Sequence, residues 1–206
     1  MSTPVSRLRL LLLFIALLPA IAFSRAAQAD WIDDVRQGGY VIVIRHGATF
    51  SNQADTDPLN IKNVAAQRQL NDQGRALAKS MGESMRKLKI PVGTVVTSMF
   101  QRAVDTGTLL GFGEVKSTFD VSEGGLVVTP DENTRRTQAL RKLAGTPPAA
   151  GSNVVIVTHK PNIMDAFGKD WFDVREGEAS VFKPDGNGGY KPIVRIKADE
   201  WSALSK

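Results

Sequence analysis

Short apolar segments alternate with helical repeats along most of the chain. Each short segment is rich in Val and Ile or other β-formers, as expected for strands inside a sheet. The longer segments repeat apolar residues at the spacing of a helix with one buried face. The predicted strands are residues 40–44, 94–97, 115–121 and 153–157. The predicted helices are approximately residues 72–88, 98–110, 130–143 and 160–167. This alternation is typical of a parallel sheet.

The last part of the chain has a different pattern. Residues 179–183 and 190–196 have strand character, and they flank a turn of Pro, Asp, Gly and Asn. Two strands joined in this way indicate an antiparallel hairpin. The predicted fold is therefore α/β, a three-layer sandwich. It has a mostly parallel sheet, helices on both faces and an antiparallel hairpin at the C-terminal edge.

A polar stretch without clear periodicity separates the first strand from the first helix. It spans residues 53–69 and has helical character only around residues 62–66. Loops of this length in compact domains are usually functional or mobile. Two interpretations stay open: the loop covers a pocket, or it is a solvated connection.

The first 29 residues have the composition of a secretory signal peptide. Two arginines precede an apolar run over residues 10–23, and residues 27–29 form an Ala-Gln-Ala cleavage site. A membrane anchor is the alternative, but the run is shorter than the roughly 20 residues of a spanning helix, and Pro19 interrupts it. We expect cleavage after Ala29 and no stable membrane insertion. Residues 30–206 would then form a single domain in the periplasm or outside the cell.

Charge and cysteine content narrow the range of partners. The formal net charge is +5, and it falls to +2 when Arg7, Arg9 and Arg25 leave with the signal peptide. A nearly neutral domain gives no compositional support for nucleic-acid binding. The chain has no Cys, so it forms no disulfides, although an exported protein could carry them.

The residues with the clearest chemical potential lie at the ends of predicted strands. The chain has two histidines, His46 and His159, and each lies just beyond a predicted apolar strand. Ligands of open α/β sheets bind beyond the carboxyl ends of the strands. A third such end leads to Arg102 in the first turn of a helix, where anions are favoured. These residues predict a phosphate site, because arginine presents a planar fork of donors to phosphate oxygens.

The motifs around these residues resemble the histidine phosphatase superfamily, in its phosphoglycerate-mutase-like branch. Residues 45–52 (Arg-His-Gly-Ala-Thr-Phe-Ser-Asn) resemble its R-H-G-x-T-x-x-N signature. Residues 97–106 resemble its S-S-x-x-x-R-A-x-x-T segment, and residues 157–159 resemble its second histidine motif. Residues 70–74 resemble the L-T-x-x-G sequence that opens its first helix. The resemblance covers approximately residues 40–162.

The resemblance implies a reaction and a set of site residues. His46 would attack a phosphomonoester and form a phosphohistidine, which water then hydrolyses. Arg45, Arg102 and His159 would surround the phosphoryl group, with Asn52, Thr49 and Gly47 also in the binding site. To attack, His46 must be neutral, with its other nitrogen fixed by an acceptor such as a backbone carbonyl near Gly47. We expect no metal and no other cofactor, because two histidines are a poor zinc set.

The group that protonates the leaving oxygen stays open among three acids. Glu123 is the first choice, because it lies in a loop after an extended segment and before the second histidine. Asp120 and Glu178 are the alternatives. In the acid-phosphatase branch the acid directly follows the second histidine, but this chain has Lys160 there.

The predicted function is an exported, metal-independent phosphatase acting on a small phosphorylated substrate. A phosphomutase would use the same phosphohistidine, and a binding protein could keep the phosphate site without turnover. Neither the natural substrate nor the oligomeric state can be predicted from the sequence.

Overall fold

A computed structural model describes residues 31–124 and 127–206 of the chain. The chain divides into two units, residues 1–34 and 35–206. Of the first unit, only residues 31–34 are described, and they are helical. The signal peptide predicted over residues 1–29 therefore lies outside the described residues. In the part of the chain that the structure describes, no helix is both long and apolar enough to cross a membrane.

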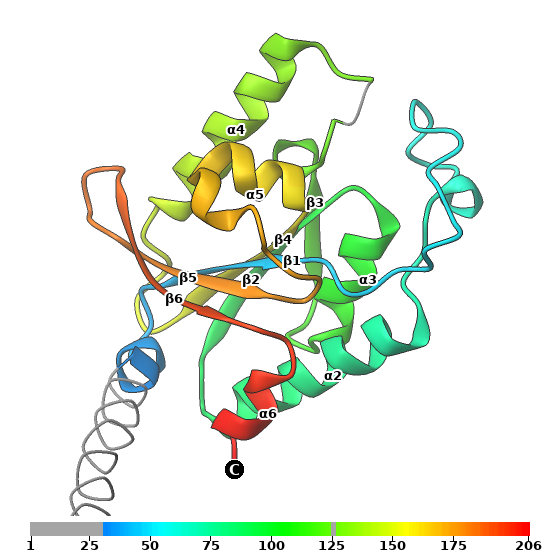
Figure 1. The fold of residues 1–206 in the computed structure, drawn as a ribbon. Coiled ribbons are helices and arrows are strands. Elements are labelled where there is room, and N and C mark those ends of the chain that lie inside the picture. Colours follow the sequence, from blue (N-terminus) through cyan, green and yellow to red (C-terminus); the bar gives the residue numbers. More distant parts are fainter. Residues whose placement is uncertain (1–30, 125–126) are drawn as a thin grey trace, which may run out of the picture. The chain divides into compact units, whose positions relative to one another are not determined.

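The second unit is built on one sheet of six strands in the order β3-β2-β4-β1-β5-β6 (Figure 1). Strands β1, β2, β3 and β4 pair in parallel, whereas β5 runs antiparallel to both β1 and β6. The strands are β1 (Val41–Arg45), β2 (Val92–Ser98), β3 (Val115–Thr118), β4 (Asn153–Thr158), β5 (Ala179–Pro184) and β6 (Tyr190–Ile196). The parallel order brings the carboxyl ends of β1, β2 and β4 to the same edge of the sheet.

Helices cover both faces of this sheet (Figure 1). One layer contains α4 and α5, and the other contains α2, α3 and α6. The helices are α2 (Asp72–Lys87), α3 (Gln101–Leu109), α4 (Pro130–Ala144), α5 (Lys160–Phe167) and α6 (Glu200–Leu204). The predicted α/β fold, with its mostly parallel sheet and antiparallel C-terminal edge, is confirmed.

Alternation along β1 explains why its apolar run is continuous. Val41 and Val43 pack into a core with Leu140 of α4 and Ile163 of α5. Successive side chains of a strand point to opposite faces, so Ile42 and Ile44 face the α2 and α3 layer. All four of these β1 side chains are fully buried.

Three short elements differ from the sequence prediction. The segment predicted as a strand over 115–121 is a strand only to Thr118. A 3₁₀ helix, η2 (Phe119–Val121), replaces the rest, and the Thr118 side chain caps it. Helix α6 and a second 3₁₀ helix, η3 (Lys169–Trp171), were not predicted. The polar stretch after β1 contains only a 3₁₀ turn, η1 (Val64–Ala66), within the segment where helical character was expected.

Candidate active site

The two histidines meet where β1 and β4 end. His46 follows the last residue of β1, and His159 follows the last residue of β4. The β1–β4 pairing puts Arg45 opposite Thr158, so the chain leaves both strands at the same level. The two imidazole centroids are 5.1 Å apart, and both side chains are buried. The rings are thus close enough to act on one phosphoryl group.

The tautomer of His46 follows from its hydrogen bond. Its Nδ1 lies 2.8 Å from the carbonyl oxygen of Gly47, which can only accept, so Nδ1 carries the proton. The lone pair is therefore on Nε2, the nitrogen a nucleophile would use. This is the backbone contact that was predicted near Gly47.

Helices α2 and α3 hold the loop that carries His46. The backbone N–H of Gly47 donates to the Thr106 hydroxyl of α3, which in turn donates to the Arg102 carbonyl. Gly74 of α2 touches the loop so closely that a Cβ there would lie 2.1 Å from the Ala48 carbonyl oxygen. The side chain of Asn71 caps α2 and also donates to the Thr49 carbonyl. The position of His46 thus depends on contacts with both α2 and α3.

His159 has the same tautomer as His46, but it turns the other ring nitrogen toward the site. Its Nε2 lies 2.7 Å from the hydroxyl of Ser98, and that hydroxyl already accepts a hydrogen bond from the Phe100 backbone N–H. The Ser98 hydroxyl hydrogen is thus available for Nε2, which leaves the proton of the neutral ring on Nδ1. Nδ1 is buried, lies 3.3 Å from the Glu123 carboxylate and has no hydrogen-bond partner among the described residues. His159 therefore presents a donor to the site.

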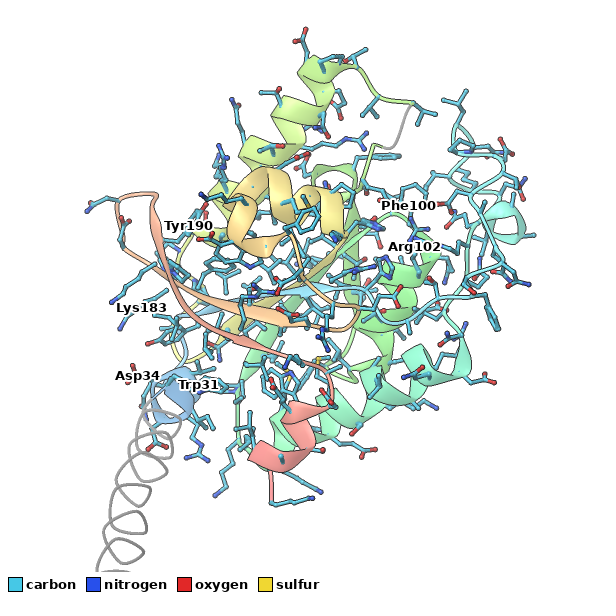
Figure 2. All side chains as sticks on the ribbon, in the orientation of Figure 1. Trp31, Asp34, Phe100, Arg102, Lys183 and Tyr190 are labelled. Atoms are coloured by element: carbon cyan, nitrogen blue, oxygen red, sulfur yellow. The ribbon has the colours of Figure 1, made fainter. Side chains whose placement is uncertain are left out.

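Arg102 is a fully buried cation at the start of α3. Its guanidinium lies over the Phe100 ring at 4.4 Å, and Figure 2 shows the two side chains close together. It forms ion pairs with Asp55, at 3.0 Å, and with Glu123. The same Phe100 ring meets the His159 ring edge-on at 5.3 Å. Phe100 thus contacts both Arg102 and His159.

Arg45 approaches the site from the end of β1. Its Nη1 donates to the Val174 carbonyl, and its Nη2 lies 3.5 Å from the Glu176 carboxylate. Its Nε is buried and unpartnered among the described residues, as is the Nε of Arg102. Three buried donors, on Arg45, Arg102 and His159, are therefore left without an acceptor. Such groups are costly to bury unless a ligand satisfies them, and all three suit an anion.

The same environment keeps both imidazoles neutral. Burial, followed by the nearby His159 and Arg102, holds the pKa of His46 well below its usual range. Burial, followed by Arg102, Arg68 and Arg45, has the same effect on the pKa of His159. A neutral His46 retains the lone pair that attack on phosphorus requires.

The structure distinguishes the three candidate acids. Glu123 contacts both Arg102 and His159, so it lies at the site. Asp120 is only partly buried and pairs with Arg135 on α4. Glu178 is buried, but its two oxygens accept from the Arg195 side chain and the Arg175 backbone. The geometry therefore favours Glu123 as the proton donor.

The remaining predicted binding residues divide between the site and its surroundings. Gly47 and Thr49 belong to the loop of His46, and the Thr49 hydroxyl donates to Glu176. Asn52 is exposed and lines a hollow formed within the loop over residues 52–69. The part assigned to Asn52 in phosphate binding therefore stays a prediction.

Sequence reasoning missed two carboxylates that pair with the arginines. Asp55 lies in the polar loop, where its Oδ1 accepts both from Arg102 and from the Arg68 backbone. Glu176 lies in the turn before β5 and contacts Arg45 and Thr49. Neither residue has a motif around it. The only available signal was the length of the polar loop, which was considered as a possible cover of the pocket.

No group of three or more His, Asp or Glu residues within 31–124 and 127–206 is arranged to hold a metal ion. The positive charge near the histidines comes from arginine side chains. The described residues therefore provide an anion site.

Comparison with known protein families finds one match. Residues 41–124 match the model of the histidine phosphatase superfamily (branch 1). This segment contains His46, Arg102 and Glu123, and the match confirms the resemblance predicted from the motifs. No curated protein sequence matches the chain.

Solved structures share the fold at low sequence identity. The protein histidine phosphatase SixA complexed with tungstate is 18% identical, with a TM-score of 0.55 over 78% of this chain and 98% of that one. A mycobacterial glucosyl-3-phosphoglycerate phosphatase with inorganic phosphate is 18% identical, with a TM-score of 0.55 over 78% and 99%. A mutant phosphoserine phosphatase from Entamoeba histolytica with phosphoserine is 15% identical, with a TM-score of 0.51 over 77% and 97%. The chain thus spans nearly the full length of these proteins.

Proposed function

We propose that the protein is an exported phosphatase that hydrolyses phosphomonoesters through a phosphohistidine on His46, without a metal ion. One observation carries this proposal. A neutral imidazole nitrogen lies beside buried donors on Arg45, Arg102 and His159 that lack acceptors among the described residues. A phosphoryl group supplies acceptors for these donors and an electrophile for the nitrogen. The phosphatases among the structural neighbours share the fold and support the same reaction.

In the proposed reaction, each step has a residue that performs it. The Nε2 lone pair of His46 forms a bond to phosphorus while the bond to the leaving oxygen breaks. Glu123 gives its proton to that oxygen, and the product alcohol leaves. The Glu123 carboxylate then takes a proton from a water molecule whose oxygen attacks the phosphohistidine. Phosphate is released and His46 is neutral again. Arg45, Arg102 and His159 stabilise the charge on the phosphoryl oxygens throughout.

The test is hydrolysis of an activated aryl phosphate by the purified protein, in the presence and absence of a chelator. We expect hydrolysis to persist in the chelator and to fall by at least a thousandfold in His46→Ala. Rapid quenching with a radiolabelled substrate should trap label on His46. Activity equal to wild type in His46→Ala would contradict the mechanism. Phosphate binding without turnover would instead indicate a binding protein, and transfer to a second hydroxyl would indicate a mutase.

Export rests on the composition of residues 1–29. In an expressing bacterium, the proposal predicts that the protein is recovered from the periplasm or the medium with Asp30 as its first residue. Replacing Leu12 and Leu13 by Arg should keep the chain in the cytoplasm with its first residues intact. N-terminal sequencing of the recovered protein distinguishes these outcomes.

A further inference from the structure

A hollow of about 170 Å³ opens beside Glu123. It lies between the loop after β1 and the segment between β3 and α4. Its walls are mainly apolar, from Leu59, Ile61, Phe100, Phe119, Val127 and Val128. An apolar cavity of about 150 Å³ holds a benzene molecule, so the hollow has room for a group of about six carbons.

The rim of this hollow concentrates exposed apolar side chains. Leu59 is 83% exposed, Phe119 is 47% exposed and Val127 is 43% exposed. These are three of the six large apolar side chains that are exposed among the described residues. Scattered single cases need no explanation, but a group around a concave site marks a binding surface.

The polar groups of the lining are already satisfied by the protein. The Ser122 hydroxyl accepts from the Met99 backbone and donates to the Thr118 carbonyl. The Arg136 guanidinium pairs with Glu132 and donates to the carbonyls of Ser122 and Glu123. Apart from the Glu123 carboxylate, the hollow therefore offers a ligand an apolar surface.

The hollow shares two residues with the phosphate site. Phe100 contacts His159 and Arg102, and it also forms a wall of the hollow. Glu123 contacts the same two site residues and borders the hollow as well. A leaving oxygen that takes its proton from Glu123 would lie at this border, and the hollow would then be next to the carbon attached to it.

We propose that the hollow binds the alcohol part of the substrate, and that this part is an apolar alkyl or aryl group. The natural substrate is then a phosphomonoester of a hydrophobic alcohol. This inference rests on the proposed function, but it concerns binding and can be tested without turnover.

A second hollow is the competing location. It also borders Glu123, but Asn133, Asn162 and Asp165 contribute to its lining. The Oδ1 of Asn162 is buried without a partner among the described residues. Such amide and carboxylate groups suit a polar alcohol, such as a sugar. The second hollow lacks Phe100, the residue that touches both Arg102 and His159, so the first is favoured.

Alkylphosphonates test the inference, because their carbon–phosphorus bond is not hydrolysed. We expect calorimetry on the purified protein to show that affinity rises about two- to fourfold per added methylene from methyl- to hexylphosphonate. A terminal hydroxyl, as in 6-hydroxyhexylphosphonate, should cancel most of the gain because it places a polar group in the apolar hollow. Equal affinities along the series, or tighter binding of the hydroxyl compound, would overturn the inference.

Matched variants locate the binding site of the alkyl chain. Leu59→Ser should lower the hexyl-to-methyl affinity ratio about three- to tenfold. Val64→Ser is the control, because Val64 is also an exposed apolar residue of the same loop but does not line the hollow. An unchanged ratio in Leu59→Ser, or an equal loss in both variants, would contradict the assignment.

The experiments distinguish a failure of the catalytic proposal from a failure of the proposed substrate class. If aryl phosphate hydrolysis depends on His46 but phosphonate affinity ignores chain length, only the substrate class is wrong. If hydrolysis is absent but affinity follows chain length and Leu59, the apolar site stands and the catalytic proposal fails.

Discussion

At the scale of single residues, two carboxylates pair with the Arg102 guanidinium that a bound phosphoryl group would also contact. Its guanidinium pairs with both Asp55 and Glu123 where a phosphoryl group would bring two negative charges. In the proposed reaction Glu123 donates a proton. Asp55 has no such role: its charge repels the substrate, and its hydrogen bonds hold the loop near the site. Because Arg102 is fully buried, this charge balance is only weakly screened by solvent.

Removing the Asp55 charge is expected to strengthen anion binding. We predict that Asp55→Asn lowers the inhibition constant of inorganic phosphate by about three- to thirtyfold, as expected when one repulsive charge is removed near a buried cation. The control is Asp57→Asn, because Asp57 lies in the same loop but accepts from Asn63 instead of Arg102. Weaker phosphate binding in Asp55→Asn would show that Asp55 mainly positions Arg102.

The role of Glu123 can be separated from its contacts by choice of leaving group. An aryl oxygen leaves readily without a proton, whereas an alkyl oxygen does not. Glu123→Gln should therefore lose about a hundredfold or more in kcat/KM on an alkyl phosphate, and far less on an aryl phosphate. Asp120→Asn serves as the control, because Asp120 pairs with exposed Arg135 and should affect both substrates little. Equal losses on both substrates in Glu123→Gln would remove it from the acid role.

The sequence was sufficient to predict those site residues that lie just after a strand. His46, His159 and Arg102 each stand within a few residues of an apolar strand, so topology alone brings them together. Asp55 and Glu176 are different, because each reaches its arginine only through the path of a loop. Loop paths depend on tertiary packing and have no sequence period to reveal them.

At the scale of elements, the start of α2 supports the loop of His46 through close backbone contact. Gly74→Ala would place its Cβ 2.1 Å from the Ala48 carbonyl oxygen and 2.7 Å from its nitrogen. Real Cβ atoms do not approach backbone so closely, so the helix or the loop must move. We expect the variant to lose about 1–3 kcal/mol of unfolding free energy, together with at least tenfold in kcat.

A variant at a second glycine of α2 distinguishes an effect on stability from an effect on activity. A Cβ at Gly82 would lie 2.0 Å from the Leu110 carbonyl oxygen, at the far end of α3 and away from the histidines. Gly82→Ala should therefore lose a similar amount of stability, with kcat within about threefold of wild type in the folded fraction. Denaturant unfolding and kinetics on both variants provide the comparison. Equal losses of kcat would indicate that neither clash acts through the loop.

The elements that were predicted well carry local signals. The Thr129-Pro130 start of α4 shows both the capping side chain and the proline expected there, with the Thr129 hydroxyl accepting from the Glu132 backbone. The miss over residues 119–121 has a local cause, because the Thr118 side chain accepts from the Asp120 backbone and turns the chain into η2. Helix α6 is only five residues long, so it shows no period.

At the scale of the whole molecule, burying two neutral histidines links stability to pH. The pKa of both His46 and His159 lies well below 6.5 in the folded protein, chiefly because both are buried. In the unfolded chain the two imidazoles take up protons below about pH 6.5, whereas in the folded chain they stay neutral at that pH. The unfolded state therefore binds more protons as the pH falls below 6.5, and stability must decrease. Above that value neither state is protonated, and the effect is absent.

We predict that the unfolding free energy falls between pH 6.5 and 5.5 by about 1 kcal/mol per histidine. Paired carboxylates act in a lower window. The pKa of Glu132, lowered to about 2 by its hydrogen bonds to Arg135 and Arg136, affects stability only below about pH 4.5. Urea unfolding of the full-length chain at pH 7.5, 6.5 and 5.5 measures the effect, and the first two values should differ least.

The chain's two histidines allow the assignment to be checked directly. His46→Asn removes one titrating group, so it should halve the loss of stability between pH 6.5 and 5.5. In the untagged wild-type protein, nitrogen-15 spectra should show both rings neutral at pH 6, with protons on Nδ1. Stability that stays level or rises as the pH falls would mean that the folded site accepts protons, and that at least one imidazole is not held neutral by burial.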